Sequence, residues 1–401
     1  MSRARPIHIF VLIDALGWRF LDGRDFLSDV LPYRKPLRTV LGFSSGAIPT
    51  ILTGVPPARH GHWNLFYYDP DGSPFHWLAH FRSLPNCVLD NRVTRKLIKE
   101  LGRKLLGMGR NFECCVSPNL MPWFNYVERR NIYEPGGISG ASSIFDELAQ
   151  NGIRSRVYTY QQWTDKEILH RAEEDLKARA ATFYFLYLSE MDHLLHDQWN
   201  QPEEPARRLG WYATQLRKLF GLGCETSPEA HFTVFSDHGM TPVRHRYDLV
   251  RDLQTLGLKI PDDYLVVYDS TMARFWFFSE RGRREIVHLL QAIPCGKILP
   301  DEELHQLGIL FPDRRYGEVI YLLHPGWLVS RSDFNGPGWI PAGMHGYHPD
   351  DPYSDAVFLS SHEPPVPVRA LADVFYCMQA AVREESSARD AEPAVPRQEG
   401  S

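Results

Sequence analysis

The residues of this chain whose types could do chemistry are three aspartates, three histidines and a serine, spread over most of its length. They are Asp14 in IFVLIDALGW, Ser44 in GFSSGAIPTILTG, Asp192 and His196 in SEMDHLLHDQW, Asp237 and His238 in VFSDHGM, and His345 in HGYH. This mixture of oxygen and nitrogen ligands suits Zn²⁺ or a similar divalent ion. Two such ions about 4 Å apart can hold the attacking and leaving oxygens of a phosphoryl transfer. The set therefore predicts a dinuclear metal site with phosphoryl-transfer chemistry.

The spacing within the motifs supports this interpretation to different degrees. Asp192 and His196 are four residues apart, so on a helix they project from one face and can bind one ion. Asp237 and His238 are adjacent and reach one ion only from a non-helical turn, which Gly239 would permit. Taken alone, Asp14 is better explained as a helix N-cap after a strand than as a metal ligand. Only the complete set favours a metal site.

The serine motif contains two candidate hydroxyls, Ser44 and Ser45. A serine hydroxyl is a poor nucleophile at neutral pH, but a bound metal ion stabilises its alkoxide. The following IPTILTG predicts the first turns of a helix, whose N-terminal amides would favour a bound phosphate. Both serines could equally be cap or turn residues of the SSG sequence. The residues by themselves leave the choice open.

The elements that must position these residues follow from apolar runs that alternate with helical stretches. Continuous apolar runs predict buried strands, and amphipathic stretches of ten or more residues predict helices. The strands are expected at 7–13, 155–160, 182–189 and 231–236, and the helices at 142–151, 165–179 and 202–221. This alternation predicts an α/β fold with a doubly wound, mostly parallel central sheet and helices on both faces. Asp14 and Asp237 then come just after strand ends, where open α/β sheets bind ligands.

Two inserted segments interrupt the alternation. The predicted catalytic core comprises 1–62, 136–240 and 341–383, with an aromatic-rich cap at 63–135 and an α+β cap at 241–340. The second cap is expected to contain strands near 264–268, 273–278 and 317–323 and a helix near 283–292. The polar, proline-containing residues 384–401 predict a disordered tail.

The bulk composition fits an ordinary globular enzyme of 401 residues, with 43% hydrophobic and 23% charged residues. A formal net charge of -5 argues against a general nucleic-acid-binding surface. The N-terminal sequence lacks the features of a secretory signal, and no apolar stretch is long enough to span a membrane. Six cysteines without disulfide-framework spacing fit free thiols. We therefore expect a cytoplasmic protein.

The stretch 91–108 is the one segment that raises the possibility of a membrane partner. It predicts a helix in which six Lys or Arg residues accompany leucines and an isoleucine. Such a helix can lie on an anionic membrane surface, although a solvated helix packed on one side is the more common outcome. If it does lie on a membrane, lipid-linked phosphodiesters become candidate substrates.

The ordered motifs DALGW, FSSGAIPTILTGVPPARHG, DHLLH, SDHGM and HGY resemble the alkaline phosphatase superfamily. Within it, the type I phosphodiesterase/nucleotide pyrophosphatase branch is most similar, over about residues 7–240 and again at 340–350. In that branch the nucleophile lies nine residues before the Thr of a TG pair. Counting back from Thr53 gives Ser44 rather than Ser45.

The resemblance implies two divalent ions, Zn²⁺ or alternatively Mn²⁺, and a small phosphate-ester substrate. One ion would be bound by Asp192, His196 and His345, and the other by Asp14, Asp237, His238 and the Ser44 oxygen. A covalent phospho-seryl intermediate would then pass its phosphoryl group to water. The alternatives are transfer to a lipid- or glycan-linked acceptor, phosphomonoester hydrolysis, or a non-catalytic descendant. Donors to a phosphoryl oxygen are expected near the motifs, and the candidates are Asn64, Tyr160 and Gln161.

Overall fold

The four strands predicted from apolar runs lie side by side in one six-stranded sheet. The computed structural model describes residues 6–81, 86–109, 112, 114–333 and 339–390. The strand order is β2 (Tyr33–Leu37), β16 (Ala356–Ser360), β7 (Ala230–Phe235), β1 (Ile7–Ile13), β6 (Phe183–Leu188) and β5 (Ser155–Tyr158). β7, β1, β6 and β5 are parallel, whereas β16 is antiparallel to both of its neighbours. The prediction of a mostly parallel α/β sheet is confirmed.

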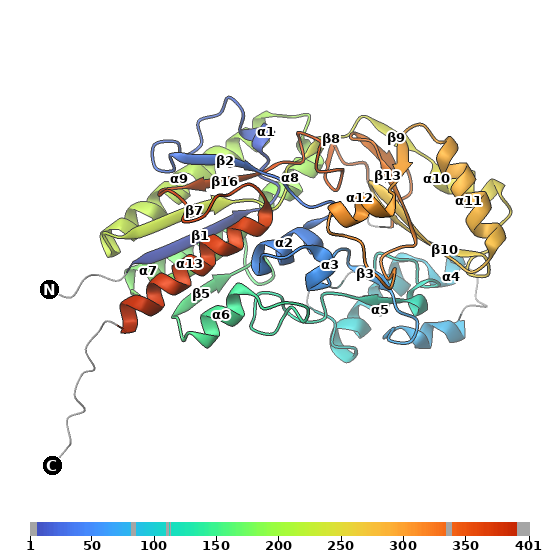
Figure 1. Cartoon of the computed structure of the whole chain (residues 1–401), viewed down its shortest axis with the longest axis horizontal. Helices are drawn as coiled ribbons and strands as arrows, with labels where there is room; N and C mark the ends of the chain where they lie inside the picture. The colour runs from blue at the N-terminus through green and yellow to red at the C-terminus, as the bar shows by residue number, and fades with distance from the viewer. Residues whose placement is uncertain (1–5, 82–85, 110–111, 113, 334–338, 391–401) are drawn as a thin grey trace, which may run out of the picture.

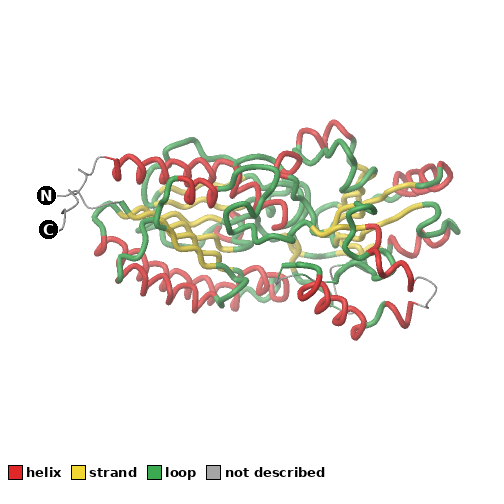
Figure 2. The backbone as a smooth tube through the Cα atoms, turned by 90° about the horizontal axis from the view of Figure 1, so that it is seen from below, coloured by secondary structure: helices red, strands yellow, loops and turns green. Residues whose placement is uncertain are grey.

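Helices cover both faces of this sheet, as expected for a doubly wound fold (Figure 1; Figure 2). One face carries α2 (Ser44–Thr53), α6 (Ile144–Gln150) and α13 (Leu371–Asp390), and the other carries α7 (Asp165–Lys177), α8 (Glu190–Gln198) and α9 (Glu203–Thr226). Alternate residues of β1 face opposite ways, so Ile9 and Val11 pack against α7 and α9 while Phe10 and Leu12 face α2 and α13. Burying each such side chain stabilises the fold by about 1.5–3 kcal/mol.

The second lobe is built on a four-stranded antiparallel sheet and lies at the right of Figure 1. Its strand order is β10 (Tyr264–Asp269), β11 (Met272–Phe277), β13 (Val319–Leu323) and β12 (Gly296–Ile298). Its helices are α10 (Leu249–Thr255), α11 (Glu280–Ala292) and α12 (Asp301–Gln306). Short pairs join β14 (Trp327–Val329) to β9 (His245–Tyr247), and β15 (Gly343–Met344) to β8 (Thr241–Pro242).

The aromatic-rich segment folds onto this second sheet. Its elements are β3 (Phe66–Tyr68), a 3₁₀ turn at His76–Phe81, α4 (Asn86–Leu89), α5 (Arg92–Leu105), a 3₁₀ turn at Met121–Trp123 and β4 (Phe124–Tyr126). The short helices α1 (Trp18–Leu21) and α3 (Pro57–His60) belong instead to the α/β core. Phe66, Phe75 and Phe112 share one buried cluster with Leu265 of β10 and Trp276 of β11. The two inserted segments therefore share a hydrophobic core.

The C-terminal helix corrects one prediction. α13 extends to Asp390, and Glu385 within it is buried. Residues 384–390 are therefore helical rather than part of a disordered tail, because they continue a helix whose apolar residues up to Val382 pack on the sheet. The rest of the predicted tail, 391–401, lies outside the described residues.

No helix in the described part of the chain is long and apolar enough to cross a bilayer.

Candidate metal centre

Three aspartates follow the carboxyl ends of three adjacent parallel strands. Asp14 comes directly after β1, Asp237 follows β7, and Asp192 lies in the first turn of α8, which follows β6. Because β7, β1 and β6 are neighbours, the sheet brings the three carboxylates to one edge. Sequence positions more than 200 residues apart thus meet at one point of the fold.

The first ligand group is formed by α8 and the loop after β15. Asp192 and His196 lie on one face of α8, and the Nε2 of His196 is 3.3 Å from Asp192 Oδ1. The Nε2 of His345 is 3.7 Å from the same oxygen. One ligand atom from each residue lies within 4.8 Å of the others. The four-residue spacing of Asp192 and His196 therefore places both side chains close enough to bind one ion.

The second ligand group lies at the ends of β1 and β7. His238 Nε2 is 3.5 Å from Asp14 Oδ1 and 3.2 Å from Asp237 Oδ2. Asp14, Asp192 and His238 also offer atoms within 4.8 Å of one another, so Asp192 belongs to both groups. The sharp turn needs Gly239, because a Cβ there would lie 2.1 Å from a backbone carbonyl oxygen.

Ser44 begins α2 and brings its hydroxyl to the second group. Its Oγ lies 3.1 Å from His238 Nε2. Ser45 instead donates to the Trp63 carbonyl at 2.9 Å. The approach to α2 depends on Gly42, whose φ is +123° and where a Cβ would lie 2.7 Å from Trp63 Nε1. Only Ser44 of the two serines therefore faces the ligand groups.

The buried carboxylates of this centre fit divalent cations. Asp14 Oδ1, Asp192 Oδ1 and Asp237 Oδ2 are buried without hydrogen-bond partners among the described residues. Burial, with the charges of Asp237 and Asp192, raises the pKa of Asp14 well above its usual value. Stacking of the His238 and His345 rings, with centroids 3.7 Å apart, joins the two groups. Cations bound here would supply both the missing contacts and the opposing charge.

Several residues that the sequence did not single out orient these ligands. Tyr187 of β6 donates a hydrogen bond to Asp14 Oδ2, and Thr39 Oγ1 donates to the Asp237 carbonyl at 2.7 Å. The Nδ1 of His196 is 2.8 Å from the Gly343 carbonyl, so it carries the proton and leaves Nε2 available as a ligand. In the sequence, the one feature that could have indicated such a supporting residue is the position of Tyr187 near the end of the apolar run that forms β6.

The three candidate substrate contacts lie in different surroundings. Asn64 is fully buried, and both of its amide atoms lack hydrogen-bond partners among the described residues. Tyr160 packs its ring edge-on against Tyr187, with centroids 4.9 Å apart. Gln161 lines a separate cavity of about 240 Å³ beside Tyr126 and Arg130. Asn64 directly follows Trp63, whose carbonyl accepts a hydrogen bond from Ser45 in the first turn of α2. Tyr160 contacts Tyr187, which donates to Asp14. Gln161 has neither connection among the described residues.

A cavity of about 460 Å³ opens onto the first ligand group. Its wall combines core and second-lobe residues: Phe43, Asp192, His193, His196, Asp197, Ser270, Trp339, Met344 and His345. Phe43 lies edge-on to His345, and Trp339 lies edge-on to His196. Trp339 also donates to Asp197 Oδ1 at 2.9 Å. The cavity thus offers two aromatic side chains beside the ligand residues.

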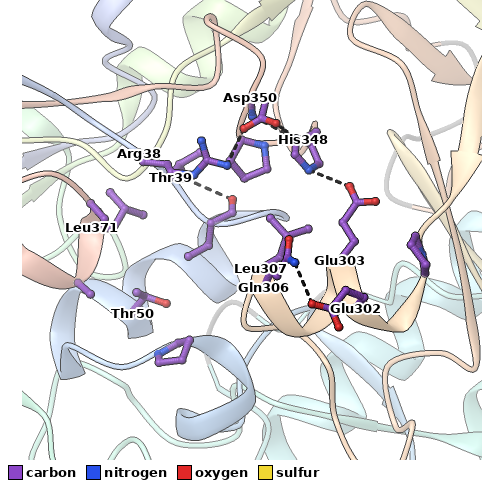
Figure 3. Close-up of a pocket in the computed structure, with 16 residues that line it drawn as sticks. Arg38, Thr39, Thr50, Glu302, Glu303, Gln306, Leu307, His348, Asp350 and Leu371 are labelled. Carbon is purple, nitrogen blue, oxygen red and sulfur yellow. Dashed lines mark hydrogen bonds and ion pairs between the residues drawn. The ribbon is translucent and has the colours of Figure 1, made fainter.

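A different cavity, of about 500 Å³, separates α12 from α2 and contains none of the predicted site residues (Figure 3). Ion pairs cross its rim, with Arg38 2.6 Å from Asp350 and His348 Nε2 3.0 Å from Glu303. The His348–Glu303 contact joins the core to the second lobe, whereas Arg38 and Asp350 both belong to the core.

Comparisons with known proteins show the family and the fold of the chain. A family model described as type I phosphodiesterase/nucleotide pyrophosphatase matches residues 43–348. No curated protein sequence matches the chain. Among solved structures, an inactive variant of murine ectonucleotide pyrophosphatase/phosphodiesterase 5 in complex with AMP aligns with a TM-score of 0.65 at 16% identity. That alignment covers 98% of this chain and 96% of the other.

Human ectonucleotide pyrophosphatase/phosphodiesterase 5 aligns with a TM-score of 0.65 at 14% identity, covering 94% of this chain and 95% of the other. Phosphonoacetate hydrolase from Sinorhizobium meliloti 1021, in complex with phosphonoformate, aligns with a TM-score of 0.63 at 16% identity. That alignment covers 95% of this chain and 96% of the other. At these identities the structural matches establish the shared fold.

Proposed function

Because the chain belongs to the type I phosphodiesterase/nucleotide pyrophosphatase family, we propose that it hydrolyses phosphate diesters through a covalent intermediate on Ser44. Family membership makes it a metal-dependent phosphoester hydrolase of the alkaline phosphatase superfamily. The observation that carries the finer proposal is the position of Ser44 Oγ at the start of α2, 3.1 Å from His238 Nε2.

Two divalent ions, with Zn²⁺ as the proposed metal, fit the two ligand groups. Asp192, His196 and His345 would bind one ion, and Asp14, Asp237, His238 and Ser44 would bind the other. When bound, such ions lower the pKa of a coordinated hydroxyl and neutralise charge that develops on phosphoryl oxygens.

The reaction requires two displacements at phosphorus. Ser44 Oγ gives up its proton to solvent as it attacks the phosphorus, the bond to the leaving alcohol breaks, and that alcohol takes up a proton from solvent. Water then attacks the phosphoserine, releases the phosphoryl group as a monoester and restores the Ser44 hydroxyl. The N-terminal end of the ten-residue helix α2 favours the negative charge of the phosphoryl group at Ser44.

Asn64 is the proposed donor to a phosphoryl oxygen. It follows Trp63, whose carbonyl accepts the Ser45 hydrogen bond at the first turn of α2. A buried amide without partners costs about 1–3 kcal/mol. Donation from its Nδ2 to a bound phosphoryl oxygen would remove the part of that cost that comes from the amide NH₂ group, and only when substrate is present.

A nucleotide-like or aryl leaving group fits the cavity beside the first ligand group. Phe43 and Trp339 present flat aromatic surfaces there, and stacking of a planar group on such rings is favourable. The presence of AMP in a structurally similar protein supports the nucleotide class as substrate.

The test is hydrolysis of bis-p-nitrophenyl phosphate and of p-nitrophenyl phosphate by protein loaded with Zn²⁺ or Mn²⁺. We expect diester turnover that disappears on chelation and falls at least about 10³-fold in Ser44→Ala, because the attacking group is lost. Ser45→Ala is the matched control and should keep most of the activity. Equal losses in the two variants would contradict the assignment of Ser44, and preferential monoester turnover would make the enzyme a phosphatase.

A lipid-linked phosphodiester is the second candidate substrate, because of the exposed face of α5. Val93, Leu97 and Leu105 are 78%, 58% and 74% exposed on this helix, beside its Lys and Arg side chains. Such a surface suits contact with anionic lipid headgroups. Flotation with phosphatidylserine-containing vesicles tests it, with Leu97→Gln/Leu105→Gln expected to abolish binding. Absence of binding by the unaltered protein would remove this candidate.

A further inference from the structure

Three histidines from neighbouring strands gather at the end of the sheet opposite the metal centre. His8 of β1 lies directly across from His231 of β7. His362, two residues after β16, stacks its ring on His231 with centroids 4.1 Å apart. Glu384 of α13 reaches the same place, with its Oε2 3.4 Å from His8 Nε2. His8 and Asp14 are separated by six residues of extended strand, or about 20 Å.

The ligand atoms of this cluster are close enough for one ion. One atom each from His8, His231 and Glu384 lies within 4.8 Å of the others. Zinc bonds of about 2.0–2.1 Å place tetrahedral ligands about 3.3 Å apart, so small side-chain rotations would complete the geometry. His8 is buried, and its Nε2 has no hydrogen-bond partner among the described residues. A buried nitrogen directed at a carboxylate is suited to metal binding.

The histidines are also in the protonation state that binds metals. Burial, with the nearby His231 and His362, lowers the pKa of His8 to about 3. Burial likewise lowers the pKa of His231 and of His362. Neutral imidazoles therefore face the carboxylate at physiological pH, and neutral imidazole is the ligand form.

We propose that His8, His231 and Glu384 bind a third divalent ion, with Zn²⁺ as the preferred metal and His362 or water as fourth ligand. This site is separate from the dinuclear centre and does not depend on the function proposed for it. The ligands come from β1, β7 and α13, so the ion would fasten the end of the C-terminal helix to the sheet.

The experiment measures zinc per chain by elemental mass spectrometry, after gel filtration of the untagged full chain loaded with Zn²⁺. His231→Gln/Glu384→Gln leaves the buried His8 intact and changes only positions that are partly or fully exposed. We expect this variant to bind one zinc ion fewer than the unaltered chain and to show a smaller rise in Tm on adding Zn²⁺. An unchanged zinc content would overturn the proposal.

Two controls separate this site from other causes. His170→Gln/Glu174→Gln removes an exposed His–Glu pair at 3.5 Å that belongs to no three-residue ligand group in the described structure, and should leave zinc content unchanged. In an Asp192→Asn background, the His231→Gln/Glu384→Gln change should still remove one ion. When His231→Gln/Glu384→Gln is made in the otherwise unaltered chain, loss of one ion without loss of diester turnover supports the third site. Equal zinc loss in the His170 control would show adventitious binding and overturn it.

Discussion

At the scale of single residues, the Tyr187 hydroxyl has the clearest supporting role, because it donates to the Asp14 carboxylate. Removing a hydrogen bond to a metal ligand typically costs 10–100-fold in metal affinity or activity. We predict that Tyr187→Phe lowers kcat/KM for a diester about 10-fold or more, with little change in Tm since the ring is retained. Steady-state kinetics at several Zn²⁺ concentrations measure the effect.

Tyr184→Phe is the matched control for this prediction. Tyr184 is in the same strand and equally buried, but it packs in the hydrophobic cluster on the opposite face of the sheet. Its loss of a hydroxyl should leave kinetics unchanged. If both variants lose activity equally, the loss in Tyr187→Phe comes from a less stable strand and not from the hydrogen bond to Asp14, which would contradict the prediction.

Asp192 should matter for both ions of the centre, since its Oδ1 lies near His196 and His345 and it also groups with Asp14 and His238. We predict that Asp192→Asn binds two metal ions fewer than the unaltered chain, whereas His196→Gln binds one fewer. Removing one carboxylate charge weakens both groups, while the histidine serves only one. Zinc content after dialysis measures this, and equal losses would contradict a shared role for Asp192.

At the scale of elements, the connection between α3 and β3 contains a buried histidine that should make folding sensitive to acid. Burial lowers the pKa of His62 to about 4, so the folded state favours the neutral ring. The stability contributed by this preference is complete above about pH 6.5 and is lost as pH falls towards 4. We predict that the free energy of unfolding, compared with His62→Asn, falls by about 2–3 kcal/mol between pH 7.5 and 4.5.

Urea unfolding of both proteins in EDTA measures this difference without the contribution of metal ions. The exposed His170 provides a control, because His170→Asn should show no comparable divergence over the same pH range. A constant difference between the unaltered protein and His62→Asn at the two pH values would contradict the prediction.

At the scale of the whole molecule, a buried ion pair in the second inserted segment contains an arginine that also donates a hydrogen bond to the first inserted segment. Arg274 of β11 pairs with Asp269 of β10, and both side chains are fully buried. Arg274 also donates to the Phe66 carbonyl at 3.0 Å and to the Tyr316 carbonyl at 3.4 Å. Arg274→Met would leave Asp269 buried without its partner, and we predict a loss of about 3–5 kcal/mol in unfolding free energy.

Chemical denaturation monitored by tryptophan fluorescence tests this, because Trp276 lies in the shared cluster. Arg283→Met breaks an exposed pair with Glu318 in the same lobe and should cost less than about 1 kcal/mol. Similar losses in the two arginine variants would refute the special role of the buried pair.

The sequence by itself determined the centre of the sheet, and it predicted the candidate metal ligands that the structure brings close together. β1, β6 and β7 are continuous apolar runs because they are buried on both faces, and this pattern is local in sequence. The positions of Asp14 and Asp237 could likewise be predicted from the sequence, because each follows the apolar run of a buried strand. Local sequence was enough to predict a residue's position in the fold wherever that position depends on its immediate neighbours in the chain.

Only the tertiary structure decided the features that depend on distant partners. The edge strand β2 (YRKPL) has no apolar pattern and forms because β16 pairs with it. The apolar residues of α13 up to Val382 pack on the sheet, and the helix continues from there to Asp390. Tyr187 lies beside Asp14 because β6 pairs with β1. The spacing to Thr53 had already favoured Ser44 over Ser45, and the structure adds that the Trp63 carbonyl accepts the Ser45 hydrogen bond while Ser44 Oγ lies 3.1 Å from His238 Nε2. Such contacts arise from packing between residues far apart in the chain, and no local pattern encodes them.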